Sequence, residues 1–268
     1  MPRVIVTRPA REAAQWVDRL QGHGLNAVAL PLMAIGPCTS PAARQALDAA
    51  RAQLADYRAL MFVSGNAVLH FFASNQPLTL IDRAQSAINT RAWTPGPGTA
   101  RALKHAGFTP DRIDGPAADA VQFDSEALWQ QVAPQIRPGD RVLIVRGQSG
   151  DAPANTQGTG RGWLAQQIEK AGGQVDFVAA YERCAPRLGA AEVALAQQAA
   201  HDGSLWLLSS SEAVAHLAQA LPGQRWGAAR ALATHPRIAD AARKAGFGQV
   251  RECRPALEDV VASIESAP

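Results

Sequence analysis

RVLIVRGQSGDAPANTQGTGRGWLAQQIEKAGGQVDFVAAYER, residues 141–183, contains a complete pattern of strand, loop, helix and strand. An apolar strand is predicted at 142–145, a polar loop with several glycines at 148–162, and a second strand at 175–180. Apolar residues at helical spacing predict a helix between the loop and the second strand, and Gly172 ends it. Such a βαβ unit is expected to be right-handed, with its loop at the carboxyl edge of a parallel sheet.

The same pattern occurs at the N-terminus, which indicates an internal duplication. A strand at 4–6, a helix ended by Gly24 and a return strand at 28–30 repeat the order of the central segment. Equivalent residues are Val4 and Val142, Arg8 and Arg146, Gly24 and Gly172, residues 64–68 and 210–214, and residues 99–108 and 238–247. The offsets of the first and third pairs differ by about ten residues, and the loop at 148–162 tolerates such an insertion best.

Strands and helices alternate along both halves of the chain, which predicts an α/β fold with two doubly wound parallel sheets. The length of 268 residues suits two domains. Residues 31–41 are rich in Pro, Gly, Ser and Thr, and we interpret them and residues 184–186 as crossings between domains. Ser125 is predicted to be the N-cap of a helix that contains Leu128.

The composition is that of a folded, soluble chain, with 47% hydrophobic and 18% charged residues. The net charge of +3 does not require a nucleic-acid partner, although it suits a polyanionic small molecule. The three cysteines lie far apart, without metal-ligand spacing, as expected of reduced thiols. The chain enters a strand at once and has no apolar run of membrane-spanning length, so we expect a cytoplasmic protein without a signal peptide or membrane contact.

Ligands of doubly wound sheets bind beyond the carboxyl ends of the strands, and those ends carry hydroxyl, glycine and arginine residues here. Helix N-termini and hydroxyls together bind carboxylate or phosphate groups. Helix capping would also explain each Ser or Thr alone, whereas six such ends in register favour a shared anionic ligand. The candidate residues are Thr7, Arg8, Ser64, Gly65, Asn66, Gly96, Gly98, Thr99, Arg146, Gly147, Ser209, Ser210, Ser211, Thr234, His235 and Arg237.

Several other chemistries lack their residue patterns. Gly96 and Gly98 come without the third glycine and the later acidic residue of a dinucleotide loop, and there is no GxxxxGK[ST] motif. No Ser-His-Asp set is recognised, and no pair of carboxylates stands at the strand ends, which argues against metal and glycosidase chemistry. Histidines within helices, such as His70, are interpreted as surface residues, and His235 as a contact rather than a base.

Tyr181 is the most informative single residue, because it follows a predicted strand where the chain should pass between domains. One interpretation is an aromatic residue of a domain interface. The other is a phenol that faces the interdomain cleft and donates to a leaving hydroxyl or to a carboxylate.

These motifs together resemble those of the uroporphyrinogen-III synthase family, over residues 4 to about 260. Each motif is weak alone, but the ordered set is specific. The motifs are Val6-Thr7-Arg8-Pro9, Pro31-Leu32, Val63-Ser64-Gly65-Asn66-Ala67-Val68, Gly96-Pro97-Gly98-Thr99-Ala100, Arg146-Gly147 with Arg161, Tyr181-Glu182-Arg183, Ser209-Ser210-Ser211-Glu212-Ala213-Val214 and Thr234-His235-Pro236-Arg237-Ile238-Ala239.

The resemblance implies a crossed domain organisation instead of a simple tandem divided near residue 140. One discontinuous α/β domain would comprise residues 1–35 and 184–268, and the other residues 36–183. Two extended linkers would join them.

The resemblance also implies the reaction. The substrate would be hydroxymethylbilane, a linear tetrapyrrole with eight carboxylates, and hydroxymethylbilane synthase would be the partner that transfers it. Loss of water and attack by ring D through a spiro intermediate would close the macrocycle with ring D inverted, in heme biosynthesis. No cofactor or metal would be needed, and a monomer is expected. The alternative is a catalytically silent ligand-binding or sensor module of the same fold.

By the same resemblance, Tyr181 would assist departure of the hydroxyl, while Ser64, Thr99 and Ser210 would be hydroxyls of the cleft. Arg161, which opens a predicted helix, would also bind substrate, although the insertion at 149–160 puts the role of this loop in question. The second copy carries Ile238 where the first has Thr99, so a hydroxyl there is not required, and Thr234 or backbone amides would replace it.

Overall fold

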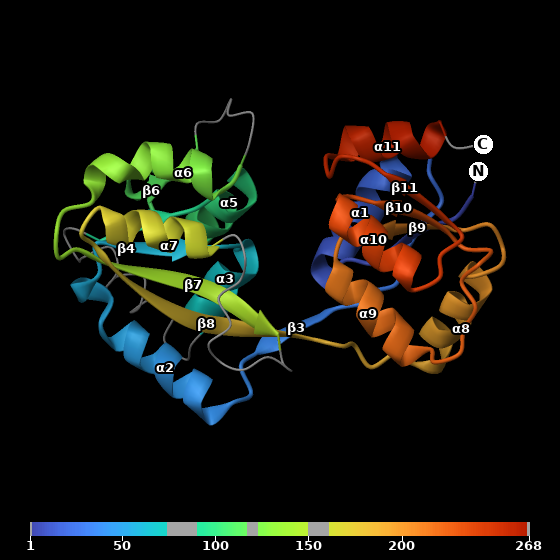
Figure 1. Ribbon diagram of the computed structural model, residues 1–268, viewed down its shortest axis with the longest axis horizontal. Coiled ribbons are helices and arrows are strands. Elements are labelled where there is room, and N and C mark those ends of the chain that lie inside the picture. The colour runs from blue at the N-terminus through green and yellow to red at the C-terminus, as the bar shows by residue number, and fades with distance from the viewer. Residues whose placement is uncertain (1, 74–89, 117–122, 150–160, 267–268) are drawn as a thin grey trace. The chain divides into compact units, whose positions relative to one another are not determined.

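The computed structural model describes residues 2–73, 90–116, 123–149 and 161–266 (Figure 1). The chain forms two compact units: unit 1 comprises Met1–Ala34 with Cys184–Pro268, and unit 2 comprises Ile35–Arg183. Ile35, assigned to the first domain from the sequence, instead lies in a strand of the sheet of unit 2, which accounts for this difference of one residue.

Unit 1 is built on a five-stranded parallel sheet in the order β11-β10-β9-β1-β2. Its strands are β1 (Val4–Val6), β2 (Ala27–Ala29), β9 (Leu205–Leu208), β10 (Arg230–Ala233) and β11 (Gln249–Glu252). Because the side chains of a strand alternate between faces, Val4 and Val6 pack under α1 (Ala10–Gly22) and α11 (Leu257–Glu265), whereas Ile5 packs on the opposite face. That face is covered by α8 (Ala190–Ala199), α9 (Ser211–Ala220) and α10 (Pro236–Lys244).

Unit 2 contains a six-stranded sheet in the order β3-β8-β7-β4-β5-β6. Its strands are β3 (Ala34–Pro37), β4 (Ala59–Phe62), β5 (Arg91–Trp93), β6 (Ile113–Asp114), β7 (Arg141–Ser149) and β8 (Gln174–Cys184). One face packs against α2 (Pro41–Ala52), α3 (Gly65–Phe72) and α5 (Pro97–His105), and the other against α6 (Ser125–Val132) and α7 (Arg161–Lys170). Short 3-10 helices occur at Leu54–Asp56, Pro110–Arg112 and Ala133–Gln135. The two apolar layers explain why the central strands are continuous hydrophobic runs.

The duplication is visible in the topology. The order β2-β1-β9-β10-β11 in unit 1 matches β8-β7-β4-β5-β6 in unit 2, and β3 is an additional edge strand. The pair β1 and β2 comes first along the chain in unit 1, whereas the equivalent pair β7 and β8 comes last in unit 2. The two sheets therefore have the same strand order in space but a circularly permuted order along the chain. The helices α1 and α7 are followed by Gly24 and Gly172, both with positive φ (75° and 88°), a backbone conformation that favours glycine at the end of a helix.

Three predictions of local structure were wrong. Asp124, not Ser125, is the N-cap of α6, since its carboxylate accepts from Ala127 N. Residues 31–41 are more than a linker, because β3 lies within them. The two central strands of unit 2 are longer than predicted, because β7 and β8 pair as far as Ser149 and Arg183 across a register shift between Arg146 and Gly147.

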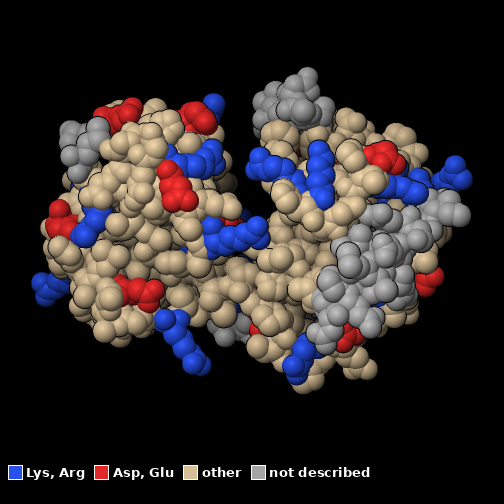
Figure 2. All heavy atoms as spheres, turned by 180° about the vertical axis from the view of Figure 1, so that it is seen from behind, with Lys and Arg blue, Asp and Glu red and all other residues tan. Residues whose placement is uncertain are grey.

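On the face drawn in Figure 2, basic side chains stand in small groups among acidic ones, and most of the visible surface is uncharged. This distribution agrees with the small net charge. Within the described residues, no helix combines the length and the apolar character that crossing a membrane requires.

Candidate active site

In unit 2, the parallel strands bring Tyr181 and Ser64 together at the carboxyl edge of the sheet. Tyr181 lies on β8 and is 5% exposed, and Ser64 lies two residues after the end of β4. Their hydroxyl oxygens are 3.2 Å apart, and either hydroxyl can donate the hydrogen bond. Tyr181 therefore lies inside a strand rather than after its end, and its phenol already has a polar partner.

Gly147 makes room for the Tyr181 ring. It is paired with Tyr181 across β7 and β8, just after the register shift. A Cβ atom at Gly147 would lie 2.3 Å from both Cε2 and Cζ of Tyr181 and 2.8 Å from its hydroxyl oxygen. Only glycine at this position is compatible with the observed position of the ring.

His70 lies against the same ring, although its position within a helix suggested a surface residue. The ring centroids of His70 and Tyr181 are 5.7 Å apart, with an interplanar angle of 32°. Burial lowers the pKa of His70, so its neutral form is favoured. An apolar strand followed by Ser-Gly-Asn predicts the start of α3, but no sequence signal indicates which helical side chain meets a strand 111 residues away.

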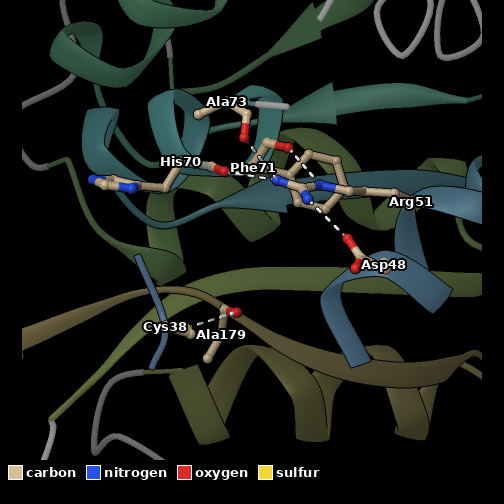
Figure 3. Close-up of polar contacts among 7 residues, drawn as sticks. All are labelled: Cys38, Asp48, Arg51, His70, Phe71, Ala73 and Ala179. Carbon is tan, nitrogen blue, oxygen red and sulfur yellow. Dashed lines mark hydrogen bonds and ion pairs between the residues drawn. The ribbon is translucent and has the colours of Figure 1, made fainter. Parts of the chain in front are cut away.

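The helix α3 holds Ser64 and His70, and both of its ends are fixed by hydrogen bonds. At the start, the Ser64 hydroxyl accepts from Ala67 N at 3.2 Å. At the end, the Arg51 guanidinium donates to the carbonyl oxygens of His70 and Phe71, each at 2.9 Å. Figure 3 shows Arg51 against this end of the helix, with the His70 ring pointing away from it. A cation at the C-terminus of a helix also stabilises the helix dipole.

A second network ties β8 to the segment that follows β3. The buried carboxylate of Glu182 accepts from Thr39 N and Thr39 Oγ1, both at 2.9 Å, and from Gln148 Nε2 at 3.0 Å. Burial favours the neutral acid, but these hydrogen bonds prevail and lower the pKa of Glu182. Cys38 donates to the Ala179 carbonyl at 3.4 Å (Figure 3), and burial, followed by the Glu182 charge, raises the pKa of its thiol to about 11. This network fixes the backbone on both sides of Tyr181.

The two arginines predicted at the ends of equivalent strands each lie over an aromatic ring. The Arg146 guanidinium carbon is 5.0 Å from the centroid of Phe177, and that of Arg8 is 4.3 Å from the centroid of Trp16. Burial lowers the pKa of both side chains, and the Arg183 charge adds to this effect at Arg146. Nε of Arg8 is buried and has no hydrogen-bond partner among the described residues.

The other candidate residues of unit 2 lie in the first turns of helices. Gly65 and Asn66 are the first residues of α3, and Gly96 is the N-cap of α5, where its N–H donates to Thr94 Oγ1 at 3.3 Å. Thr99 is only 7% exposed inside α5 rather than at a strand end. Gly98 is exposed in the same helix. Arg161 begins α7, and the insertion predicted at 149–160 lies outside the described residues apart from Ser149.

The candidates of unit 1 also meet at one edge, on the neighbouring strands β1, β9 and β10. Thr7 is buried and donates to the Leu207 carbonyl at 2.7 Å, so it serves the fold directly. Ser210 caps α9 by accepting from Ala213 N at 3.3 Å, between Ser209 and Ser211. At the start of α10, Nδ1 of His235 accepts from the backbone N–H of the exposed Arg237 at 3.1 Å, and Thr234 precedes His235. Ser211 donates to the Arg237 carbonyl at 3.3 Å, which joins these two helix starts.

Each unit thus presents hydroxyls, an arginine and helix N-termini along one sheet edge, an arrangement suited to carboxylate groups. In the described ranges, His, Cys, Asp and Glu side chains form no group of three that could hold a metal ion. Among the described residues, only the edge of unit 2 adds a phenol, that of Tyr181.

Comparisons with known proteins agree with this chemistry. A family model described as "Uroporphyrinogen-III synthase HemD" matches residues 14–262. Among curated relatives, the uroporphyrinogen-III synthase of Synechococcus elongatus is 28% identical, over 84% of this chain and 78% of the relative. That of Escherichia coli is 27% identical, over 96% and 97%.

A solved structure of uroporphyrinogen-III synthetase from Helicobacter pylori is 14% identical and has a TM-score of 0.57, covering 99% of this chain and 98% of that one. This similarity supports the two-domain α/β fold. Since the family model spans most of the sequence, the chain belongs to the uroporphyrinogen-III synthase family and has the activity of that family, a lyase reaction of tetrapyrrole biosynthesis.

Proposed function

We propose that the chain cyclises hydroxymethylbilane with Tyr181 as the donor to the departing hydroxyl. In this step the bond between the terminal carbon and oxygen breaks, and the hydroxyl takes up a proton and leaves as water. Electrons of the adjacent pyrrole nitrogen stabilise the resulting azafulvene cation. The substituted carbon of ring D attacks this cation, the spiro intermediate fragments and recloses, and a final proton loss restores the pyrrole.

The hydrogen bond between Ser64 and Tyr181 is the observation that carries this proposal. If Ser64 donates, the Tyr181 oxygen accepts, and the phenolic hydrogen is available to the substrate hydroxyl. The ring is fixed by Gly147 on one side and by His70 on another, and it is almost fully buried. A donor held in one orientation and away from bulk water contributes more to a transition state than the same group in solution.

The carboxylates of the substrate supply most of the binding in this proposal. Hydrogen bonds that involve a charged group contribute about 1.5–3 kcal/mol each, and neutral ones about 0.5–1.5 kcal/mol. Several contacts with Arg8, Arg146 and the starts of α3, α5, α9 and α10 would therefore suffice. Because the linear substrate also closes unaided without inversion, the binding residues must fix which carbon of ring D attacks.

Tyr181→Phe tests the role of the phenol, and Tyr57→Phe is its matched control, since the chain has two tyrosines and both are buried in unit 2. Freshly generated hydroxymethylbilane is supplied anaerobically, the product is oxidised, and the porphyrin isomers are separated. We expect predominantly type III isomer from the unaltered chain and from Tyr57→Phe. Tyr181→Phe should lower kcat by roughly a hundredfold, the scale of general acid catalysis, so that spontaneous type I isomer predominates. A Tyr181→Phe variant with unchanged kcat and isomer ratio would reduce the phenol to a packing residue.

A further inference from the structure

Unit 1 contains a cavity at the sheet edge opposite to the candidate active site. It lies at the amino ends of β9, β10 and β11 and reaches the last turn of α11. Its volume is about 280 Å³. The lining residues are Leu205, Arg230, Ala231, Leu232, Gln249, Arg251 and Ser263. Because the strands are parallel, the candidate residues of unit 1 lie at the opposite, carboxyl edge of the sheet, after β1, β9 and β10.

The strand register explains how this lining is assembled. Leu205, Arg230 and Gln249 pair across three neighbouring strands and form one row. Two residues further along these strands, Leu232 pairs with Arg251, and their side chains lie on the same face of the sheet as the first row. Leu205 and Leu232 belong to the apolar layer beneath α11, and they are 5% and 1% exposed. The cavity therefore has an apolar floor and a polar rim.

The rim is basic. Arg230 and Arg251 line the cavity together with Gln249 and Ser263, and no Asp or Glu is among the lining residues that the structure describes. Arg251 donates to Ser266 Oγ at 3.2 Å, at the exposed end of α11. Glu252 follows Arg251 on the strand but points to the opposite face, where it pairs with Arg243 at 3.3 Å.

We propose that this cavity binds a small organic anion, with a carboxylate held between Arg230 and Arg251 and a short aliphatic part against Leu205 and Leu232. Guanidinium groups present planar sets of donors that match the two oxygens of a carboxylate. The volume is just below the usual range for ligand pockets, about 300–1,000 Å³. A short dicarboxylate fits this space, whereas a tetrapyrrole does not.

The site is proposed as a second binding site, independent of catalysis. A ligand at the amino ends of the strands would not compete with a ligand at their carboxyl ends in unit 1. The apolar floor also distinguishes this site from a general anion site, because inorganic phosphate gains nothing from contact with Leu205 or Leu232.

The test is an NMR titration of the full ¹⁵N-labelled chain with glutarate, with butyramide as the neutral probe and inorganic phosphate as the purely polar one. We expect saturable shifts of the Leu232, Gln249 and Ser263 amides with glutarate, at least tenfold weaker binding of phosphate, and no saturation with butyramide. Arg230→Gln combined with Arg251→Gln should weaken glutarate binding at least tenfold. Arg225→Gln, an exposed arginine outside the cavity, should leave it unchanged.

The unaltered chain alone can refute the proposal, so the result does not depend on whether a variant folds. Absence of saturable shifts at these amides with glutarate would overturn it. Equal affinities for glutarate and phosphate would overturn the role of the apolar floor. Undiminished glutarate binding by the double arginine variant would overturn the assignment of the two guanidinium groups.

Discussion

Gly147→Ala is expected to displace Tyr181 while leaving the fold intact. The added Cβ would lie 2.3 Å from two ring carbons, whereas ordinary contacts of this kind begin near 3.4 Å. The ring must therefore move by about 1 Å, and it cannot move freely because Tyr181 is 5% exposed. The hydrogen bond between Ser64 and Tyr181, now 3.2 Å, would then exceed hydrogen-bonding distance for most directions of movement.

Two magnitudes follow from this displacement. Overpacking a buried site by one methyl group costs about 1–3 kcal/mol of unfolding free energy, and the lost hydrogen bond adds about 0.5–1.5 kcal/mol. A misplacement of about 1 Å in a catalytic group lowers the rate by roughly a hundredfold. The assays are unfolding in urea and the kcat of macrocycle closure, together with the ratio of type III to type I isomer.

Gly36→Ala is the matched control. Gly36 also lies in a strand of unit 2, and a Cβ at this position meets nothing within 4 Å. We expect this variant to keep both its stability and its isomer ratio. If Gly147→Ala behaved like Gly36→Ala, then either the Tyr181 ring would not occupy the described position or its position would not matter for the reaction.

Three other predictions concern neighbours of Tyr181. Burial lowers the pKa of His70 below its unfolded value near 6.5, so the unfolded state binds more protons. The contribution of His70 to stability is therefore complete above pH 6.5 and is lost as the pH falls through the folded pKa. We expect His70→Phe to reduce the difference in Tm between pH 7.5 and pH 5.5. Glu182→Gln should cost about 1–3 kcal/mol in urea unfolding at pH 7, and the difference from the unaltered chain should shrink as the pH falls below about 4.5 and through the lowered pKa of Glu182. Ser64→Ala and Ser210→Ala each remove an N-cap and should lose similar stability, about 0.5–2 kcal/mol, but only Ser64→Ala should lower kcat sharply.

Each of these predictions has an outcome that contradicts it. An unchanged pH dependence in His70→Phe would remove His70 as the titrating group. Equal stability of Glu182→Gln at pH 7 would mean that the hydrogen bonds to Thr39 and Gln148 contribute nothing. Equal kcat values for Ser64→Ala and Ser210→Ala would place the two hydroxyls in the same role.

The fold could be predicted because parallel strands covered on both faces are encoded as short apolar runs. Residues 142–145 and 175–180 are such runs, and they are the cores of β7 and β8. The duplication was detectable for a related reason: strand ends, helix starts and closing glycines recur in the same order. The ends of β7 and β8 were missed because Arg146, Gly147 and Glu182 interrupt the apolar pattern, and only pairing between the two strands extends them.

The contacts around Tyr181 could not be predicted from residue spacing. His70 and Arg51 stand at helical positions where solvent-exposed polar residues are common. Their roles depend on where α3 packs, which is a property of the whole sheet. His70 comes from α3, which follows β4, and Gly147 comes from β7. Both are far from Tyr181 in sequence, and the sheet order β8-β7-β4 brings these elements together.

The duplicated halves retain equivalent groups for binding an anion. Arg8 and Arg146 are equivalent in sequence, although Arg8 follows β1 whereas Arg146 lies within β7. Both lie over an aromatic ring, and burial lowers the pKa of both. Ser64 and Ser210 cap equivalent helices with the same side-chain hydrogen bond. Each unit therefore retains groups of the kind that the proposed binding of carboxylates would use.

The phenol of Tyr181, in contrast, has no counterpart at the equivalent edge of unit 1. Ala27 pairs with Val4, and Val175 pairs with the equivalent residue Val142. The offset of 148 residues between Ala27 and Val175 also relates Met33 to Tyr181. The offset of 138 that relates Val4 to Val142 places Pro9 where unit 2 has Gly147. Unit 1 therefore lacks both the proton donor and the glycine that makes room for it, although it keeps the serine. Loss of one hydroxyl from one carbon requires a single donor, so a duplicated fold needs to specialise only one of its two edges. We propose that this is the edge of unit 2, because the phenol of Tyr181 lies there.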